Sequence, residues 1–140
     1  MNNLARLRSF IRDMTRLADR HGEDEQRMLD EGEKLLRGLI AQDDWLPEEL
    51  SRSSPESYRQ YLLHCDPMER FSVVSFVWTP GQRTPIHDHT VWGLVGVMRG
   101  EETCEEYSHD IKPTGRHPVH RGQVDRVSPR IGDVHVVANE

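Results

Sequence analysis

The segment from Gly81 to Gly100 most constrains what this chain can fold into, because it contains two histidines, His87 and His89, two residues apart. The pair follows a Pro/Gly turn and precedes an apolar run, a context that predicts a strand. In a strand, side chains i and i+2 point to the same face, so both imidazoles can hold one ion while Asp88 points away. Neutral imidazoles suit iron, zinc, copper or nickel and match a hard ion such as calcium poorly.

Length and charge narrow the class of protein. The 140 residues suffice for one domain, and 18 basic against 24 acidic residues give a net charge of -6, which argues against a nucleic-acid partner. No apolar run is long enough for a bilayer, and Met1–Phe10 lacks a signal-peptide core, so we expect a cytoplasmic protein with no membrane partner. Cys65 and Cys104 are far apart, which predicts neither a thiolate zinc site nor a redox pair. We expect both to be reduced, with Cys65 packed.

The first half of the chain has the apolar spacing of helices. Apolar residues recur every three or four positions from Leu4, after Asn2 or Asn3 as a cap, and again after an acidic start at Glu23. Prolines at the starts of two further segments indicate short helices. We predict helices over residues 4–18, 24–40, 47–50 and 56–63. Residues 1–66 would then form the helical N-terminal portion of a single domain, 1–140.

The second half, residues 67–140, has the short β-branched and aromatic runs of an antiparallel barrel or sandwich. We predict strands over residues 71–78, at His87/His89, and over 92–98, 101–107, 124–127 and 134–138. Arg99-Gly100 is expected to be the hairpin turn between two of them. Glutamates on both faces of Glu101–Tyr107 indicate an edge strand, and the Pro/Gly-rich segment Ser108–Gly122 is typical of a loop.

A third histidine, His135, follows a glycine turn at Gly132 and enters a predicted strand. If that strand faces the His87/His89 pair, three imidazoles on a rigid wall would hold a metal and leave coordination positions open. The remaining histidines are expected to be structural or exposed: His21, His64, His109, His117 and His120.

These residues carry a family resemblance. The spacing of Gly81, His87-x-His89, Gly93 and Gly100 resembles the first cupin motif, with Gly93 in place of its usual glutamate, and Pro129–Asn139 is similar to the second motif. The three-histidine pattern resembles the cysteine dioxygenase family of thiol dioxygenases, which hold ferrous iron. The strings P-I-H-D-H-T-V-W-G-L-V-G-V and I-G-D-V-H, with the helical front of the chain, are similar to its bacterial branch. The resemblance implies a cupin jelly-roll barrel with Fe(II) on His87, His89 and His135.

The resemblance also implies a reaction, the oxidation of a small thiol by O2 to its sulfinate. Gln60 matches the position where mammalian-type enzymes hold the substrate carboxylate with an arginine, and a glutamine there resembles the 3-mercaptopropionate dioxygenases. Arg59 is one residue away, about 100° around the predicted helix, so a register shift of one would favour cysteine as substrate instead. Gly93 stands where mammalian-type enzymes carry a cross-linked cysteine, so no such cross-link is expected.

One departure leaves alternatives open. The family's chain continues past the third histidine into strands that carry a serine, a histidine and a tyrosine of the active site, whereas this sequence ends at Glu140. We therefore expect a cupin barrel truncated at its C-terminus, with unpaired edges that favour self-association. A non-catalytic cupin that binds a metal or small ligand is the first alternative. A zinc, nickel or manganese cupin, such as an isomerase, is the second.

Overall fold

The computed structural model describes residues 3–140, which form two α-helices, one short 3-10 helix and seven strands. The helices are α1 (Leu4–His21), α2 (Glu25–Ile40) and η1 (Glu48–Leu50). The strands are β1 (Arg59–Cys65), β2 (Ser72–Val77), β3 (Gly93–Gly96), β4 (Glu101–Tyr107), β5 (Pro113–His120), β6 (Val124–Val127) and β7 (His135–Ala138). Within residues 3–140, no helix combines the length and the apolar character needed to cross a membrane.

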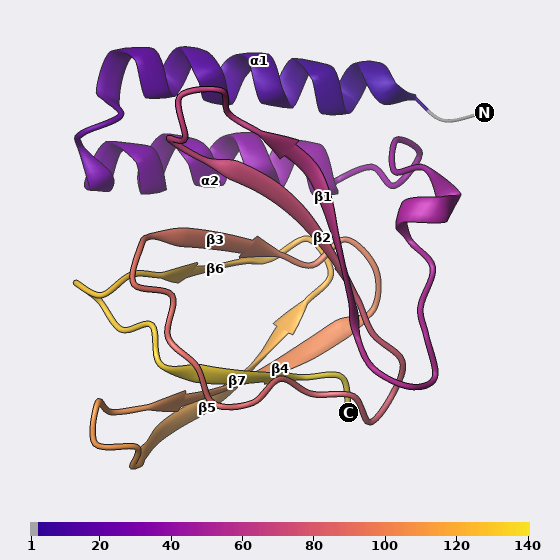
Figure 1. Ribbon diagram of the computed structural model, residues 1–140, viewed down its shortest axis with the longest axis vertical. Coiled ribbons are helices and arrows are strands. Elements are labelled where there is room, and N and C mark those ends of the chain that lie inside the picture. Colours follow the sequence, from indigo (N-terminus) through magenta and orange to yellow (C-terminus); the bar gives the residue numbers. More distant parts are fainter. Residues whose placement is uncertain (1–2) are drawn as a thin grey trace.

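The seven strands form three small antiparallel sheets, ordered β1-β2, β3-β6 and β5-β4-β7. Figure 1 shows α1 beside α2, the β3-β6 sheet next to α2, and the three-stranded sheet farthest from the helices. Among the described residues the three sheets are not joined into one continuous ladder. A β-rich fold with a helical N-terminal portion is therefore confirmed at this level.

The two long helices lie where the sequence predicts them and bury their apolar faces against each other. Phe10 and Met14 of α1 meet Met28 of α2 in the main core, where burial of apolar side chains stabilises the fold. The Asp24 side chain caps α2 by accepting a hydrogen bond from the backbone N–H of Arg27. Asn3 is the N-cap residue of α1 but makes no side-chain capping bond, and Asn2 lies outside the described residues.

The helix predicted over residues 56–63 is wrong, because Arg59–Cys65 is strand β1. It pairs antiparallel with β2, with Gln60 opposite Phe76. Tyr58 packs its ring edge-on against Trp78, with the ring centroids 5.6 Å apart. Pairing with the β-branched and aromatic residues of β2 thus overrides the weak local preference for a helix. The resulting hairpin spans residue 66, where the sequence places the end of the helical portion.

Three further predictions about the second half are wrong. Residues 113–120, expected in a loop, form β5, and its prolines are tolerated because β5 is an edge strand. Glu101–Tyr107 is the central strand β4 rather than an edge, because it pairs with β5 on one side and with β7 on the other. Arg99-Gly100 does turn the chain, with Gly100 at φ +72°, but β3 pairs with β6 instead of β4.

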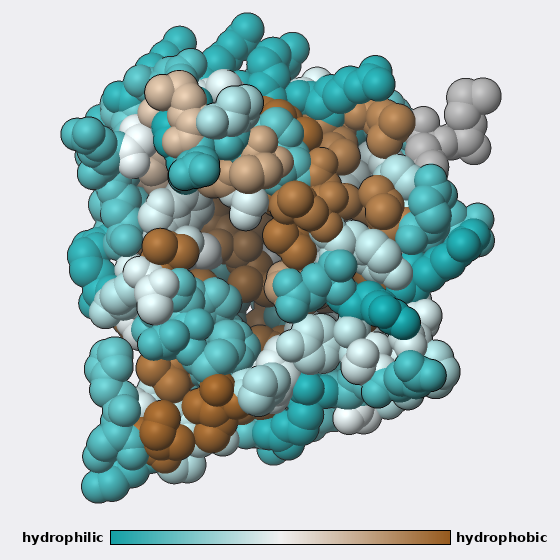
Figure 2. Space-filling model, in the orientation of Figure 1, coloured by the Kyte–Doolittle hydropathy of each residue, from teal (hydrophilic) through white to brown (hydrophobic). Residues whose placement is uncertain are grey.

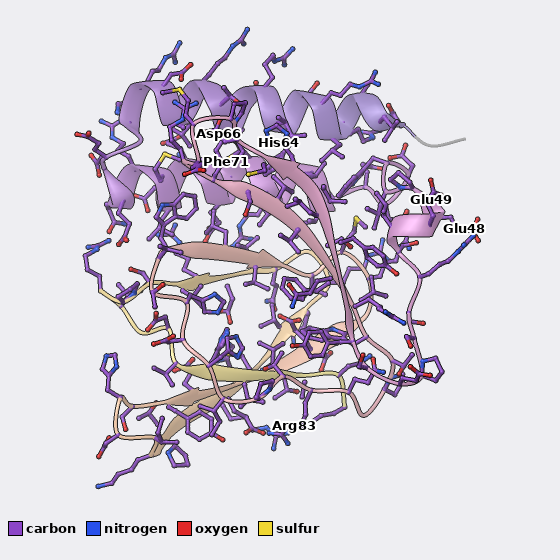
Figure 3. The ribbon with its side chains drawn as sticks, in the orientation of Figure 1. Glu48, Glu49, His64, Asp66, Phe71 and Arg83 are labelled. Atoms are coloured by element: carbon purple, nitrogen blue, oxygen red, sulfur yellow. The ribbon has the colours of Figure 1, made fainter. Side chains whose placement is uncertain are left out.

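The turn of the β1–β2 hairpin is held by Asp66, which is 2% exposed. Its carboxylate accepts hydrogen bonds from the backbone N–H and from Nε of Arg70, at 3.1 and 2.8 Å. Figure 3 places Asp66 beside Phe71, next to the helices, and the Asp66 N–H donates to the Phe71 carbonyl. Hydrogen bonding to Arg70 keeps the pKa of Asp66 below its ordinary value of 3.8.

We expect Asp66→Asn to lower the melting temperature at neutral pH, because Arg70 loses its charged partner. A carboxyl group whose pKa falls on folding contributes stability that is fully present above its unfolded pKa and is lost as pH falls through the folded pKa. The gap between wild type and variant should therefore be full at pH 7 and close below about pH 3.8. Thermal unfolding across this range measures it, with Asp43→Asn, in an exposed pair with Arg99, as the control. A gap that persists unchanged in acid would contradict the assignment.

Candidate metal centre

The structure brings together the three histidines that the sequence singles out. His89 Nε2 lies 2.8 Å from His135 Nε2, and His135 Nε2 lies 3.1 Å from His87 Nε2. The three ring centroids are 4.6 to 5.0 Å apart. His135 is buried and the other two rings are half-buried. Three ring nitrogens thus converge on one point that is still reachable from outside.

Two chain segments far apart in sequence meet to form this cluster. His135 is the first residue of β7, as the sequence predicts, and its backbone exchanges two hydrogen bonds with His87, at 3.1 and 2.9 Å. The continuous strand predicted at His87/His89 is wrong, because the segment pairs with β7 only through isolated bridges, Arg83 with Ala138 and His87 with His135. Thr90 adopts a left-handed backbone, φ +58°, which is incompatible with an extended strand. The two bridges nevertheless hold the His87 segment beside His135.

Asp133 fixes the loop that carries the histidine pair. Its Oδ2 accepts hydrogen bonds from the backbone N–H groups of His89 and Thr90, at 3.1 and 3.0 Å. Asp133 is 4% exposed, so these charge-assisted bonds form away from water. Asp88 is exposed, in keeping with its predicted outward direction. Asp133 is therefore the positioning residue that ties the first histidine segment to the second.

The outer nitrogens of two rings have partners of their own. His87 Nδ1 lies 2.8 Å from the Pro85 carbonyl oxygen, which can only accept, so Nδ1 carries the proton and Nε2 presents a lone pair to the cluster. His135 Nδ1 lies 3.5 Å from Cys104 Sγ. Such contacts orient a metal-ligating imidazole and fix its tautomer.

Two of the three imidazoles have a lowered pKa. Burial lowers the pKa of His135 to about 4, and the neighbouring rings of His89 and His87 lower it further. Burial, followed by the His87 ring, also lowers the pKa of His89. Neutral imidazole is the form that binds a metal, so the lowered pKa of these two rings favours cation binding.

No carboxylate belongs to this cluster among the described residues. At Gly93, where the cupin motif has glutamate, an added Cβ would lie 2.9 Å from Val127 Cγ2 of β6. A side chain there would collide with the neighbouring strand, so the local packing itself favours glycine. The donor set stays at three histidines.

Gln60 is not linked to the histidines by any hydrogen bond among residues 3–140. It is exposed on β1, and cross-strand pairing places it on the same face as Leu62, Val74 and Phe76. These three apolar side chains are exposed, and Figure 2 shows apolar surface over this hairpin. On a strand Arg59 points to the opposite face from Gln60, so a one-residue change of register would exchange the faces. The substrate role of Gln60 stays a prediction.

The sequence missed a second group of metal-binding side chains. Cys104, Glu106 and His117 each place one ligand atom within 4.8 Å of the others. These side chains come together because β4 pairs with β5, which places Cys104 opposite His117. The sequence predicts a loop at β5, so it does not predict this pairing. The alternation of Glu102, Cys104 and Glu106 on one face of a strand was the available signal. Cys65, expected to be packed, is exposed.

Of the other histidines, His120 pairs at the surface with Glu101, and His64 packs against Phe71, with its Nε2 buried and unpartnered. Neither meets other metal-binding groups within the described residues. The case for a metal centre rests on the geometry and on the two cupin-like motifs, because the chain matches no protein-family model.

Proposed function

We propose that the chain is an iron-dependent thiol dioxygenase of cupin fold. It would oxidise a small thiol carboxylate, with 3-mercaptopropionate favoured, by adding both atoms of O2 to the sulfur to give the sulfinate. The observation that carries the proposal is the convergence of three imidazoles, from His87, His89 and His135, with no carboxylate among them in residues 3–140. The motifs around these histidines support the same family.

The donor set fits an iron ion. Two nitrogens that lie about 2 Å from one ion and at a right angle to each other are about 3 Å apart. The Nε2 atoms of His89 and His87 lie 2.8 and 3.1 Å from that of His135, which agrees with neighbouring ligands of one ion. Imidazole is a normal ligand for Fe(II). Bound iron would supply the open coordination positions at which a thiolate and O2 react.

The protein's own residues position the reactants. The Pro85 carbonyl and Cys104 hold the rings of His87 and His135, and Asp133 holds the loop that carries His89. Gln60 would donate its amide N–H to the substrate carboxylate. A neutral amide cannot form the bidentate, charge-assisted pair that an arginine forms with a carboxylate. Gln60 therefore favours a substrate whose binding does not depend on such a pair.

Oxygen consumption by the iron-loaded protein tests the proposal. We expect thiol-dependent uptake with sulfinate as the product, and faster turnover of 3-mercaptopropionate than of cysteine. Gln60→Arg should shift this preference towards cysteine, because an arginine restores the charged carboxylate contact. Gln42→Arg, at another exposed glutamine, is the matched control and should leave the preference unchanged.

Each contrary result points to a different function. Equal rates, or faster cysteine oxidation, would remove the 3-mercaptopropionate assignment. Iron binding without thiol-dependent uptake would leave a non-catalytic metal-binding cupin. Zinc, nickel or manganese in protein grown without metal supplementation, together with no activity after iron loading, would indicate another class of cupin.

A further inference from the structure

A second cluster of metal-binding side chains lies between the β4–β5 strand pair and β6. Cys104 and Glu106 alternate on one face of β4, and His117 stands opposite Cys104 on β5. His117 Nδ1 lies 2.9 Å from a carboxylate oxygen of Glu106. Cys104 is buried and Glu106 is exposed, so the cluster reaches from the interior to the surface.

The imidazole of His117 is oriented from its other side. His117 Nε2 lies 2.8 Å from Asp125 Oδ2 on β6. Both ring nitrogens of His117 thus face a carboxylate oxygen, and a cation bound at Nδ1 would take the place of the proton between Nδ1 and Glu106. A carboxylate behind a histidine is the usual support of a metal-bound imidazole.

Glu102 is a largely buried acidic neighbour of this cluster. Glu102, two residues before Cys104 on the same face of β4, is 7% exposed, and its side chain makes no hydrogen bond or ion pair within residues 3–140. Such a group is costly unless a cation or a donor compensates for it.

The cluster lacks a permanent positive charge. Among the described residues, neither Glu106 nor Asp125 pairs with an arginine or lysine. Both contact the His117 ring, and Asp125 also accepts a hydrogen bond from the Cys104 thiol. Three carboxylates, one imidazole and one thiol therefore share a small region in which a divalent cation would balance the charge.

We propose that Cys104, Glu106 and His117 form a second metal site, for a zinc-like divalent cation, separate from the three-histidine centre. A thiolate, an imidazole and a carboxylate are the ligands that Zn²⁺ takes at about 2.3, 2.0 and 2.1 Å, and water completes the set on the exposed side of Glu106. Asp125 orients His117, and Glu102 compensates the ion's charge. The site does not rest on the thiol dioxygenase function.

The two sites are neighbours but do not share an ion. Cys104 Sγ lies 3.5 Å from Nδ1 of His135. The other ring nitrogen of His135, Nε2, faces the other two histidines. The Cys104 sulfur therefore lies behind the ring and not among the converging Nε2 atoms. A cation on Cys104 would hold the thiolate that accepts the Nδ1–H of His135, so occupancy of one site would stabilise the orientation of the other.

Cobalt(II) is the probe, because thiolate ligation gives a near-ultraviolet charge-transfer band that imidazole and carboxylate ligation do not give. The full-length chain is titrated in a Cys65→Ser background, which removes the exposed thiol. We expect two cobalt ions per chain and a charge-transfer band. His87→Ala/His89→Ala should bind one ion and keep the band, since it leaves Cys104 intact.

Variants of the second site distinguish the residues that bind the metal from the residues that lie beside them. Cys104→Ser should lose the band, and His117→Gln should weaken the cobalt affinity that the band reports at least about tenfold. Asp125→Asn should keep the band and weaken affinity by about tenfold, as loss of an outer partner does. His120→Gln, on the same strand but paired with Glu101 at the surface, is the control and should change nothing.

The proposal is overturned if the Cys65→Ser protein shows no charge-transfer band. It is also overturned if the band survives in Cys104→Ser, or if His117→Gln and His120→Gln bind cobalt alike. Circular dichroism checks the fold of each variant, and His117→Gln decides the question if Cys104→Ser does not fold. None of these readouts depends on thiol oxidation, so this site and the proposed function fail or stand separately.

Discussion

Replacing His135 with alanine should abolish the proposed dioxygenase activity and weaken iron binding by at least about 100-fold. The loss of a residue that only hydrogen-bonds to a metal ligand already lowers metal affinity by about 10- to 100-fold. His135 is the central member of the cluster, with its Nε2 2.8 Å from His89 and 3.1 Å from His87. Two imidazoles without the third leave a weak site. Iron content after dialysis against a chelator, with oxygen consumption, measures the effect.

His135 is buried, so its removal also perturbs packing, and His89→Ala should give the same loss from a half-buried position. His109→Ala, at an exposed histidine, is the control and should retain iron and activity. A His135→Ala protein that keeps full iron occupancy would contradict the three-histidine centre.

Replacing Asp133 should damage the site without removing a ligand. Asp133→Ala removes the acceptor of the part-buried N–H groups of His89 and Thr90, which costs about 1 kcal/mol of folding free energy. The loop that carries His89 then loses its anchor, and iron affinity should fall by about 10- to 100-fold. Chemical denaturation and a competitive iron titration measure the two effects.

A graded series distinguishes positioning from general destabilisation. Asp133→Asn keeps an acceptor oxygen in place and should lose less stability and less iron affinity than Asp133→Ala. Asp88→Asn, one residue from each histidine but exposed, should change neither. If Asp133→Ala lowers stability while iron affinity stays at the wild-type value, the positioning role is wrong.

The three histidines could be predicted because their spacing and flanking glycines are local. The H-x-H pair and the glycine turn before His135 are visible in the sequence, and the structure adds only their distances. Asp133 could not be assigned in advance, because its partners are backbone N–H groups 43 and 44 residues away. A turn aspartate looks the same in sequence whether or not it reaches a distant loop.

The helices were predictable for a related reason. The apolar residues of α1 and α2 recur with the helical period, so the buried face is visible in the sequence. The strand conformation of β1 depends on its pairing with β2, which follows it in the chain. Pro113 and Pro118 indicate a loop unless their strand lies at the edge of a sheet, as β5 does. The edge position depends on how the whole sheet assembles, so the local sequence does not predict it. The Cys104–Glu106–His117 cluster was missed with it.

The most direct test of the three-histidine iron centre is the iron K-edge X-ray absorption spectrum of the iron-loaded protein under anaerobic conditions, before and after addition of 3-mercaptopropionate. It should be recorded on the Cys104→Ser variant as well, to exclude sulfur from the second cluster. We expect scattering from three imidazoles, and a new sulfur neighbour when the thiol is added, in both proteins. Fewer than three imidazoles, or a spectrum that the thiol leaves unchanged, would contradict it.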